Sequence, residues 1–401
     1  MKKLLLTLSL GLLFNLSVFN NADAKTQNIK VGIIPQTNEK ITFSSSGNGG
    51  FFVEQGDSIV KVADIEPRQF CTVNNKNGIL EIFVDNKKIA NLKSRVIIKS
   101  TDLKSKYVPL IFAGSKWYRG KVEVFPSLKN NKLTTVVNTL PLEEYLYGVV
   151  PSEMPASWPL EALKTQAVAA RTYALKNISQ YSKEGFDILP TTMSQVYEGA
   201  EAETPVSNQA VEETKGKVAT YKSKLIEAYY SSGAGGLTES GLEAWGSDLP
   251  YLKSVKDFDF DSPKYNWYKH VTNEDIQGFI KKEYKTNIGK ILSMNVTETT
   301  ESGRAKKVKI KGLNGSVEVN PKKMRLALKL NSTLFQVTVA EPGTIEENNI
   351  PVPELFLFSG RGFGHGSGMS QFGARYLAKT GKTFDEILKH YYQGIEITDF
   401  K

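Results

Sequence analysis

Alternating apolar and polar positions dominate the first third of the chain. Ile79–Val84 and Arg95–Ile98 carry β-branched and aromatic residues between turns rich in Asn, Gly and Lys, which is the pattern of half-buried strands. This texture continues to about residue 132. We expect residues 25–116 to form a β-rich N-terminal region that serves as a scaffold or, alternatively, as a surface-binding module.

After one further strand, the spacing of apolar residues changes from that of a strand to that of a helix. Leu133–Val137 is typical of a strand and Leu142–Val150 of a short amphipathic helix. Pro151 and Pro155 bracket the next segment, which is expected to be a constrained loop. A strong helix is predicted over 159–181, because small and apolar residues recur there at three- and four-residue spacing: Leu160, Leu163, Ala167, Ala170 and Ala174.

The second half of the chain contains both strand-like and helix-like spacings of apolar residues. Asn273–Tyr284 predicts a helix, 292–339 alternates like antiparallel strands, and 341–353 is expected to be a surface linker. Leu355–Phe358 indicates a strand, which a glycine-rich loop and two short helices follow; Thr383 and Glu386 form a capping box for the last helix. The expected fold class is α+β, with a mixed α+β domain over 117–401 that contains an antiparallel β insertion at about 270–345.

The first 24 residues differ from the rest. Lys2 and Lys3 precede an apolar run from Leu4 to Phe19, and an Ala-Asp-Ala sequence ends at Ala24. A basic N-terminal region, a short apolar segment and small residues at the cleavage site are the features of a secretory signal peptide. The alternative is an uncleaved membrane anchor, but the run is short for a span of about 20 residues. The protein is therefore expected to be secreted, periplasmic or cell-wall associated.

Composition narrows the classes of partner. The 401 residues include one cysteine, Cys71, so no intramolecular disulfide can form. A net charge of +9 favours an anionic partner, and the export signal argues for an anionic membrane surface or cell wall rather than nucleic acid. The lysines are spread along the chain without long like-charge runs, so they also fit an ordinary solvated surface.

Glu153 is the first candidate for chemistry. It lies between two prolines and close to Met154 and Trp158, an apolar and stiff setting that raises the pKa of a carboxyl group toward that of a general acid. The alternative is a surface glutamate in an ordinary ion pair. Glycosidases usually employ two carboxyl groups, and this segment supplies one.

The second candidate is the loop from Gly360 to Gln371. Glycine occupies every second position from 360 to 368, which allows close approach of a backbone to a ligand and would leave His365 exposed. This even spacing is not that of a nucleotide-binding fingerprint. A structural turn is the alternative, but a turn requires fewer glycines.

Metal and cofactor sites are not indicated. The three histidines and the cysteine show no ligand spacing, and no nucleophile-elbow motif supports a serine triad. Asp257, Asp259 and Asp261 start like a calcium loop, but Ser262 and Pro263 follow where glycine is required. We expect no cofactor and no metal.

Long motifs are distributed over roughly 70% of the chain, from about residue 117 to 397. They are these segments: Leu140–Leu146, Gly148–Pro155, Trp158–Pro159, Glu161–Tyr173, Gln195 with Tyr197, Tyr230–Thr238, Trp245–Gly246, Gly362–Gln371 and His390–Tyr392. Together they resemble the SpoIID/LytB family of peptidoglycan-active proteins.

The resemblance implies a function and a set of site residues. Active members of the family are lytic transglycosylases that prefer glycan strands without stem peptides, and the glutamate of the Ser-Glu-Met-Pro motif, here Glu153, is their single acid/base. Some relatives bind zinc near the Ser/Gly segment, but this chain lacks Cys and His between 229 and 240. Candidate substrate-binding residues are Lys164, Gln166, Arg171, Gln195, Tyr197, Ser231, Ser232, Thr238, His365 and Gln371.

Two other functions remain open at this point. Some members of the family are described as modifiers of cell-wall amidases, so the chain could be a non-catalytic, wall-binding enhancer of an N-acetylmuramoyl-L-alanine amidase. In that case Glu153 would be dispensable. A structural protein of the wall surface is the third reading. The expected partners are therefore peptidoglycan glycan strands and, for the enhancer, an amidase.

Overall fold

The computed structural model describes residues 27–400, apart from 56–57, 103–107, 342–344 and 347–349. The predicted signal peptide over 1–24 lies outside these residues. The described chain is about 24% helix and 39% strand, which confirms the β-rich α+β class. None of its helices has the length and apolar character that a membrane span requires.

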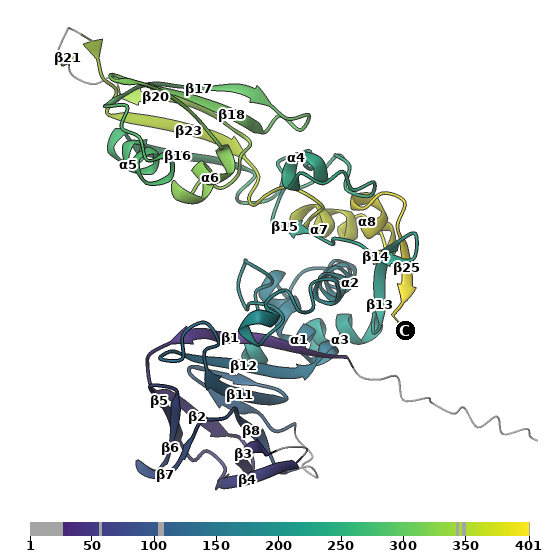
Figure 1. Cartoon of the computed structure of the whole chain (residues 1–401). Helices are drawn as coiled ribbons and strands as arrows, with labels where there is room; N and C mark the ends of the chain where they lie inside the picture. The colour runs from purple at the N-terminus through teal and green to yellow at the C-terminus, as the bar shows by residue number, and fades with distance from the viewer. Residues whose placement is uncertain (1–26, 56–57, 103–107, 342–344, 347–349, 401) are drawn as a thin grey trace, which may run out of the picture.

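Two six-stranded antiparallel sheets form the N-terminal region (Figure 1). The first contains, in spatial order, β1 (Asn28–Thr37), β12 (Thr134–Pro141), β11 (Lys121–Pro126), β8 (Val96–Ser100), β3 (Gly49–Gln55) and β4 (Ser58–Ile65). The second contains β10 (Lys116–Tyr118), β9 (Ile111–Ala113), β2 (Ile41–Ser45), β5 (Cys71–Lys76), β6 (Ile79–Val84) and β7 (Lys87–Leu92).

These sheets include strands on both sides of residue 116. β1 pairs with β12 from Asn28↔Pro141 to Thr37↔Thr134, and β11 lies between β12 and β8. The residues from 117 to 141 thus contribute strands to the N-terminal sheets.

Helices follow the sheets: α1 (Leu142–Glu153), α2 (Leu160–Lys176) and α3 (Pro205–Glu213). The prediction of a loop from Pro151 is wrong, because α1 includes Pro151 and ends two residues later. The buried apolar face of α1, with Tyr145, Leu146 and Val149, outweighs the cost of about 3 kcal/mol for a helical proline. Helix α2 ends at Lys176, earlier than expected, and Ser179 then adopts a positive φ of 71°.

The middle of the chain joins these helices to the site. Two 3₁₀ turns, η1 (Ser182–Glu184) and η2 (Gly199–Ala202), precede α3 in the chain. After it come β13 (Lys217–Tyr221), β14 (Lys224–Leu225), β15 (Tyr230–Ser231) and α4 (Gly241–Trp245). The C-terminal strand β25 (Glu396–Asp399) pairs with β13. The end of the chain therefore lies beside the strand that follows α3.

The insertion is a separate layer with its own apolar core. Helix α5 (Asn273–Tyr284) has the predicted bounds. One sheet contains β16 (Asn266–Thr272), β23 (Leu355–Arg361) and β20 (Phe335–Glu341), and another contains β17 (Ile291–Thr299), β18 (Ala305–Gly312) and β19 (Gly315–Val319). A short helix that the strand pattern did not reveal, α6 (Pro321–Ala327), precedes β20. The insertion lies at the opposite end of the molecule from the N-terminal sheets (Figure 1).

The chain then returns from the insertion to the helices. Two short strands, β21 (Ile345–Glu346) and β22 (Ile350–Pro351), pair within the region that was expected to be a linker. After β23 come the glycine loop, β24 (Met369–Ser370), α7 (Gln371–Lys379) and α8 (Phe384–Tyr391), which confirms the two predicted helices. The predicted capping box of Thr383 and Glu386 is also confirmed.

Candidate active site

Glu153 is the last residue of α1. Its side chain is half-buried, and the N–H of Met154 still bonds to the carbonyl of Val150 at 2.9 Å. Burial raises the pKa of the Glu153 carboxyl above its ordinary value. The C-terminal end of a helix acts in the same direction, because its partial negative charge disfavours a carboxylate. The group is therefore biased toward its protonated form.

Three hydrogen-bond donors reach this carboxyl. The backbone N–H of Val196 donates to Oε1 at 2.7 Å, and Nε2 of Gln371 lies 3.4 Å from Oε2. The hydroxyl of Tyr230 is the third partner. These bonds lower the pKa, but the effect of burial exceeds theirs. Within the described residues, none of the hydrogen-bond partners of Glu153 is a carboxylate or a cation.

A relay of polar side chains orients Tyr230. The hydroxyl of Tyr145 donates to Oε1 of Gln195 at 3.3 Å, and Nε2 of Gln195 donates to the hydroxyl oxygen of Tyr230 at 3.0 Å. Because the Tyr230 oxygen accepts from Gln195, its own proton is available for Glu153. Burial raises the pKa of both tyrosines well above the ordinary value, so both stay protonated.

Gln166 supplies a buried amide next to this group. It lies on α2, and its Oε1 accepts from Nε2 of Gln371 at 3.3 Å. Its own Nε2 has no hydrogen-bond partner within the described residues, and the same holds for Oγ of Ser231. An unpaired buried donor costs about 1–3 kcal/mol. Because Gln166 is fully buried, this unpaired amide lies inside the protein, next to the side chain of Gln371.

The site is assembled from segments that are far apart in the sequence. Strand β15 runs parallel to β24, with Tyr230 opposite Met369 and Ser231 opposite Ser370. Gln371 follows directly after β24 and begins α7, which packs against α2. Of the predicted binding residues, the structure brings Gln166, Gln195 and Gln371 together with Glu153.

The glycine loop packs closely against Arg304 and against the backbone next to Tyr230. Gly366 and Gly368 have positive φ values of 75° and 73°. A Cβ atom on Gly366 would lie 2.1 Å from Nη2 of Arg304, and one on Gly368 would lie 2.0 Å from the carbonyl oxygen of Tyr229. These glycines are required for close packing as well as for their backbone conformation.

His365 is not the exposed group that its glycine neighbours predicted. Its ring packs edge-on against Trp245, with centroids 5.0 Å apart, and its Nδ1 accepts from the N–H of Ser367 at 3.1 Å. Burial, together with the charges of Arg325 and Arg304, lowers the pKa of His365 to about 4. His365 is therefore neutral at physiological pH and is not a partner of Glu153.

Two predicted cationic residues lie on the other side of α2. Arg171 is fully buried, with a two-pronged bond to Glu143 at 2.8 and 2.6 Å and further bonds to the carbonyls of Val211 and Lys217. Lys164 forms ion pairs with acidic side chains at 2.8 and 2.6 Å, those of Glu161 and Glu213. The structure does not bring either residue to Glu153.

The remaining predicted residues hold the surrounding backbone. The Tyr197 hydroxyl donates to Oδ1 of Asn138 at 2.8 Å, and Oγ1 of Thr238 accepts from the N–H of Val255 at 2.8 Å. Ser232 accepts through its carbonyl from the N–H of Phe372 at 3.0 Å. These residues frame the site without contributing a side chain to the shell of Glu153.

The acidic cluster at 257–261 is engaged in structural bonds. Asp257 accepts from the N–H of Ala234 and from the hydroxyl of Tyr391, while Asp259 accepts from the N–H groups of Gly235 and Gly236. Burial and the neighbouring Asp257 raise the pKa of Asp259 to about 7. Across the described chain, no group of three or more His, Cys, Asp or Glu side chains is arranged to hold a metal ion.

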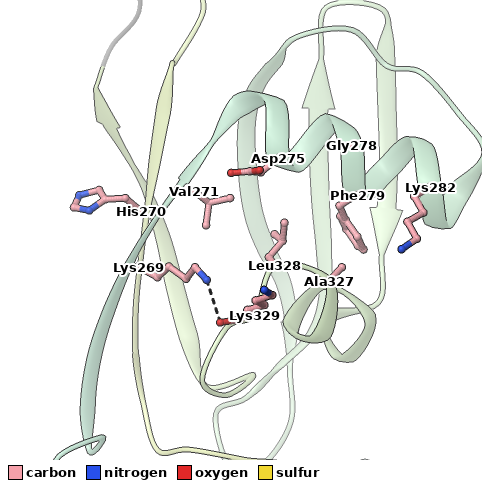
Figure 2. A pocket seen from close by; sticks show the side chains of 10 residues that line it. All are labelled: Lys269, His270, Val271, Asp275, Gly278, Phe279, Lys282, Ala327, Leu328 and Lys329. Atoms are coloured by element: carbon pink, nitrogen blue, oxygen red, sulfur yellow. Dashed lines mark hydrogen bonds between the residues drawn. The ribbon is translucent and has the colours of Figure 1, made fainter. Parts of the chain in front are cut away.

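A cavity of about 370 Å³ lies in the insertion (Figure 2). Lys269 lines one side of the cavity, and its Nζ donates to the carbonyl of Lys329 at 3.2 Å. Phe279 and Leu328 contribute apolar surface. None of the residues of the Glu153 cluster lines this cavity.

Two protein-family models match parts of this chain. The family model described as "Stage II sporulation protein" (SpoIID) matches residues 130–221. A second model, for a domain of unknown function (DUF8618), matches residues 250–368, which include the insertion. The first match contains Glu153, Gln166 and Gln195, whereas Tyr230 and Gln371 lie outside both.

Curated relatives extend the similarity. Stage II sporulation protein D of Bacillus subtilis is 38% identical over 281 residues, which are 66% of this chain and 76% of that protein. An uncharacterized protein of Brachyspira hyodysenteriae is 35% identical, over 67% of this chain and 70% of that protein. The amidase enhancer of B. subtilis is also 35% identical, but the match spans only 40% of its length. These proteins define a class of bacterial proteins with sporulation and amidase-enhancing members. The chain belongs to the SpoIID family.

The packing of the glycine loop leads to a stability prediction. Gly368→Ala and Gly216→Ala change residues of nearly equal φ, 73° and 71°, but no atom lies within 4 Å of a Cβ at Gly216. We expect Gly216→Ala to cost about 1 kcal/mol of unfolding free energy for the left-handed backbone alone. Gly368→Ala should cost about 1–3 kcal/mol more, because its methyl group meets the Tyr229 carbonyl. Urea unfolding measures both; equal losses would contradict the packing role.

Proposed function

We propose that the protein is a peptidoglycan lytic transglycosylase with Glu153 as its single acid/base. It would cleave glycan strands without stem peptides between N-acetylmuramic acid and N-acetylglucosamine, with formation of 1,6-anhydro-N-acetylmuramic acid. The main support is the half-buried carboxyl of Glu153, whose pKa is raised by burial and which is held by uncharged hydrogen-bond donors. A hydrolase that activates a water usually holds a second carboxyl group about 5–10 Å away, beyond hydrogen-bond distance, so the chemical form of the product distinguishes the two reactions.

One carboxyl group suffices for this reaction. The protonated Glu153 first donates its proton to the glycosidic oxygen, and the bond from that oxygen to C1 of the muramic acid residue breaks. The resulting carboxylate then removes the proton from the C6 hydroxyl of the same sugar as O6 bonds to C1. Glu153 regains its proton, no water is consumed, and the products are an anhydro end and a free N-acetylglucosamine end.

The shell around Glu153 fits both halves of this cycle. Burial favours the protonated acid at the start. Once the proton has left, Val196, Tyr230 and Gln371 offer hydrogen bonds to the carboxylate, which stabilise the base without an adjacent cation. A group that alternates between acid and base needs this kind of balance.

A second candidate function is enhancement of a cell-wall amidase. The 35% identity to the amidase enhancer of B. subtilis favours it. As a non-catalytic partner, the chain would bind the wall and stimulate the amidase regardless of the charge of Glu153. The two functions thus differ in what they require from this residue.

Replacement of Glu153 separates the two functions. Glu153→Gln keeps the shape of the side chain but cannot transfer a proton, so we expect cleavage of denuded glycan strands to fall by about two to four orders of magnitude or more. Glu144→Gln is the matched control, since Glu144 is a half-buried residue of the same helix whose pKa burial also raises; it should keep its activity. Wild-type rates in Glu153→Gln would refute the assignment, and amidase stimulation without any cleavage would favour the enhancer.

The dependence of kcat/KM on pH tests whether Glu153 must be protonated to begin the reaction. The acid must be protonated to begin the reaction, so kcat/KM should decline as the pH rises through the raised pKa, above the 4.5 of an ordinary glutamate. Tyr230→Phe removes a hydrogen bond that lowers this pKa, and we expect the alkaline limb to move to higher pH. Measurement of kcat/KM against pH for both proteins tests this; a limb that moves to lower pH in Tyr230→Phe would contradict the role of the hydroxyl.

Access to the wall requires export, which we propose on the signal-peptide pattern of residues 1–24. N-terminal sequencing of the protein from the extracytoplasmic fraction should give a chain that starts at Lys25. A membrane-bound protein that retains Met1 would indicate an uncleaved anchor. A cytosolic protein that retains Met1 would exclude export.

A further inference from the structure

A row of aromatic side chains extends from the active site along α7. It consists of Trp158, Phe372, Tyr376 and Phe260, and is called the aromatic ridge below. Trp158 and Phe372 meet edge to face with ring centroids 4.8 Å apart. Phe260 and Tyr376 meet in the same way, also at 4.8 Å. One ring of each pair, Phe372 and Tyr376, lies on α7.

The ridge lies on the outer face of α7. Phe372 and Tyr376 are four residues apart, so both project from the same side of the helix, and both are half-buried. The opposite side, with Ala374 and Leu377, is buried in the core. Phe260 is 54% exposed. Trp158 and Tyr376 also pack against the apolar core, so each ring of the ridge except Phe260 is exposed only in part.

An arginine fixes the two aromatic pairs relative to each other. The guanidinium carbon of Arg375 lies 5.2 Å from the ring centroids of both Trp158 and Phe372. Its Nη2 donates to Asp261 at 2.7 Å, and Asp261 follows Phe260 in the chain. Cation–π contacts and an ion pair thus hold the ridge in one conformation before any ligand arrives, which lowers the entropic cost of binding.

The ridge is continuous with the active site. Phe372 follows Gln371, whose amide lies 3.4 Å from the Glu153 carboxyl. Trp158 stands five residues after Glu153, on the loop that leads to α2. From Gln371 to Tyr376 the helix rises about 7.5 Å, and Phe260 extends the row further. The ridge therefore begins beside the Glu153 carboxyl and extends along α7 away from it.

We propose that the aromatic ridge is a binding surface for the sugars of the glycan strand beside the cleavage point. This inference rests on the proposed function, since it takes the same polymer as ligand. Pyranose rings present faces of C–H groups, which are removed from water when they lie on an aromatic ring. The electron-rich face of the ring also attracts the slightly positive hydrogens.

Phe260 is the best position for a test, because it is the most exposed ring of the ridge and its replacement costs little stability. The experiment measures the affinity of Glu153→Gln for soluble denuded glycan strands by calorimetry, alone and combined with Phe260→Leu or Phe260→Tyr. Leucine keeps an apolar side chain but removes the ring face, and tyrosine keeps the face. Tyr268→Ala is the matched control, since Tyr268 is 74% exposed and lies on β16 of the insertion.

We expect Phe260→Leu to weaken binding roughly three- to tenfold, as for the loss of one aromatic contact, while Phe260→Tyr and Tyr268→Ala bind as the parent does. Equal affinity of all four proteins would overturn the proposal. Loss of amidase stimulation without loss of glycan affinity would also overturn it, because the ridge would then serve a protein partner. Wild-type cleavage of the same strands is measured in parallel, so failure of the proposed function and failure of the ridge give different results.

Discussion

The parallel pairing of β15 with β24 is the contact on which the active site depends. It places Tyr230 opposite Met369, so that Gln371 begins α7 beside the carboxyl of Glu153. Tyr230 and Gln371 are about 140 residues apart in the chain and meet Glu153 only through this short pairing. The half-buried, uncharged shell of the carboxyl follows from it, and the raised pKa of Glu153 follows from the shell.

The insertion stabilises this pairing from outside. Arg304 is almost completely buried, and its guanidinium donates to the carbonyls of Ala234 and Leu237 in the segment after β15. The same group fills the space that a side chain at position 366 would need. The insertion is therefore more than an appendage with its own core: one of its residues buttresses both the Ser/Gly segment and the glycine loop. Arg304 thus accounts for the glycine at position 366.

Local patterns in the sequence predicted much of the fold. The bounds of β6 and α5 and the capping box of Thr383 depend on neighbouring residues alone. The loop predicted at Pro151 failed because a local rule about proline competes with the packing of a whole helix. Glu153 and Gln371 could be selected from motifs, but Tyr230 could not be singled out, since its role arises from a strand pairing between distant segments. Arg171 attracted attention as a cation, yet its partner Glu143 emerges only once α1 and α2 pack together.

The central claim is that Glu153 acts without a second carboxylate and without an activated water. The mass of the products from denuded glycan strands tests it most directly. Digestion by the wild-type protein, followed by mass spectrometry of the released fragments, should show muramic acid ends that are one water lighter than reducing ends, as the intramolecular attack of O6 requires. Reducing ends of full mass from the first turnovers would mean hydrolysis, and would contradict the single-carboxyl account.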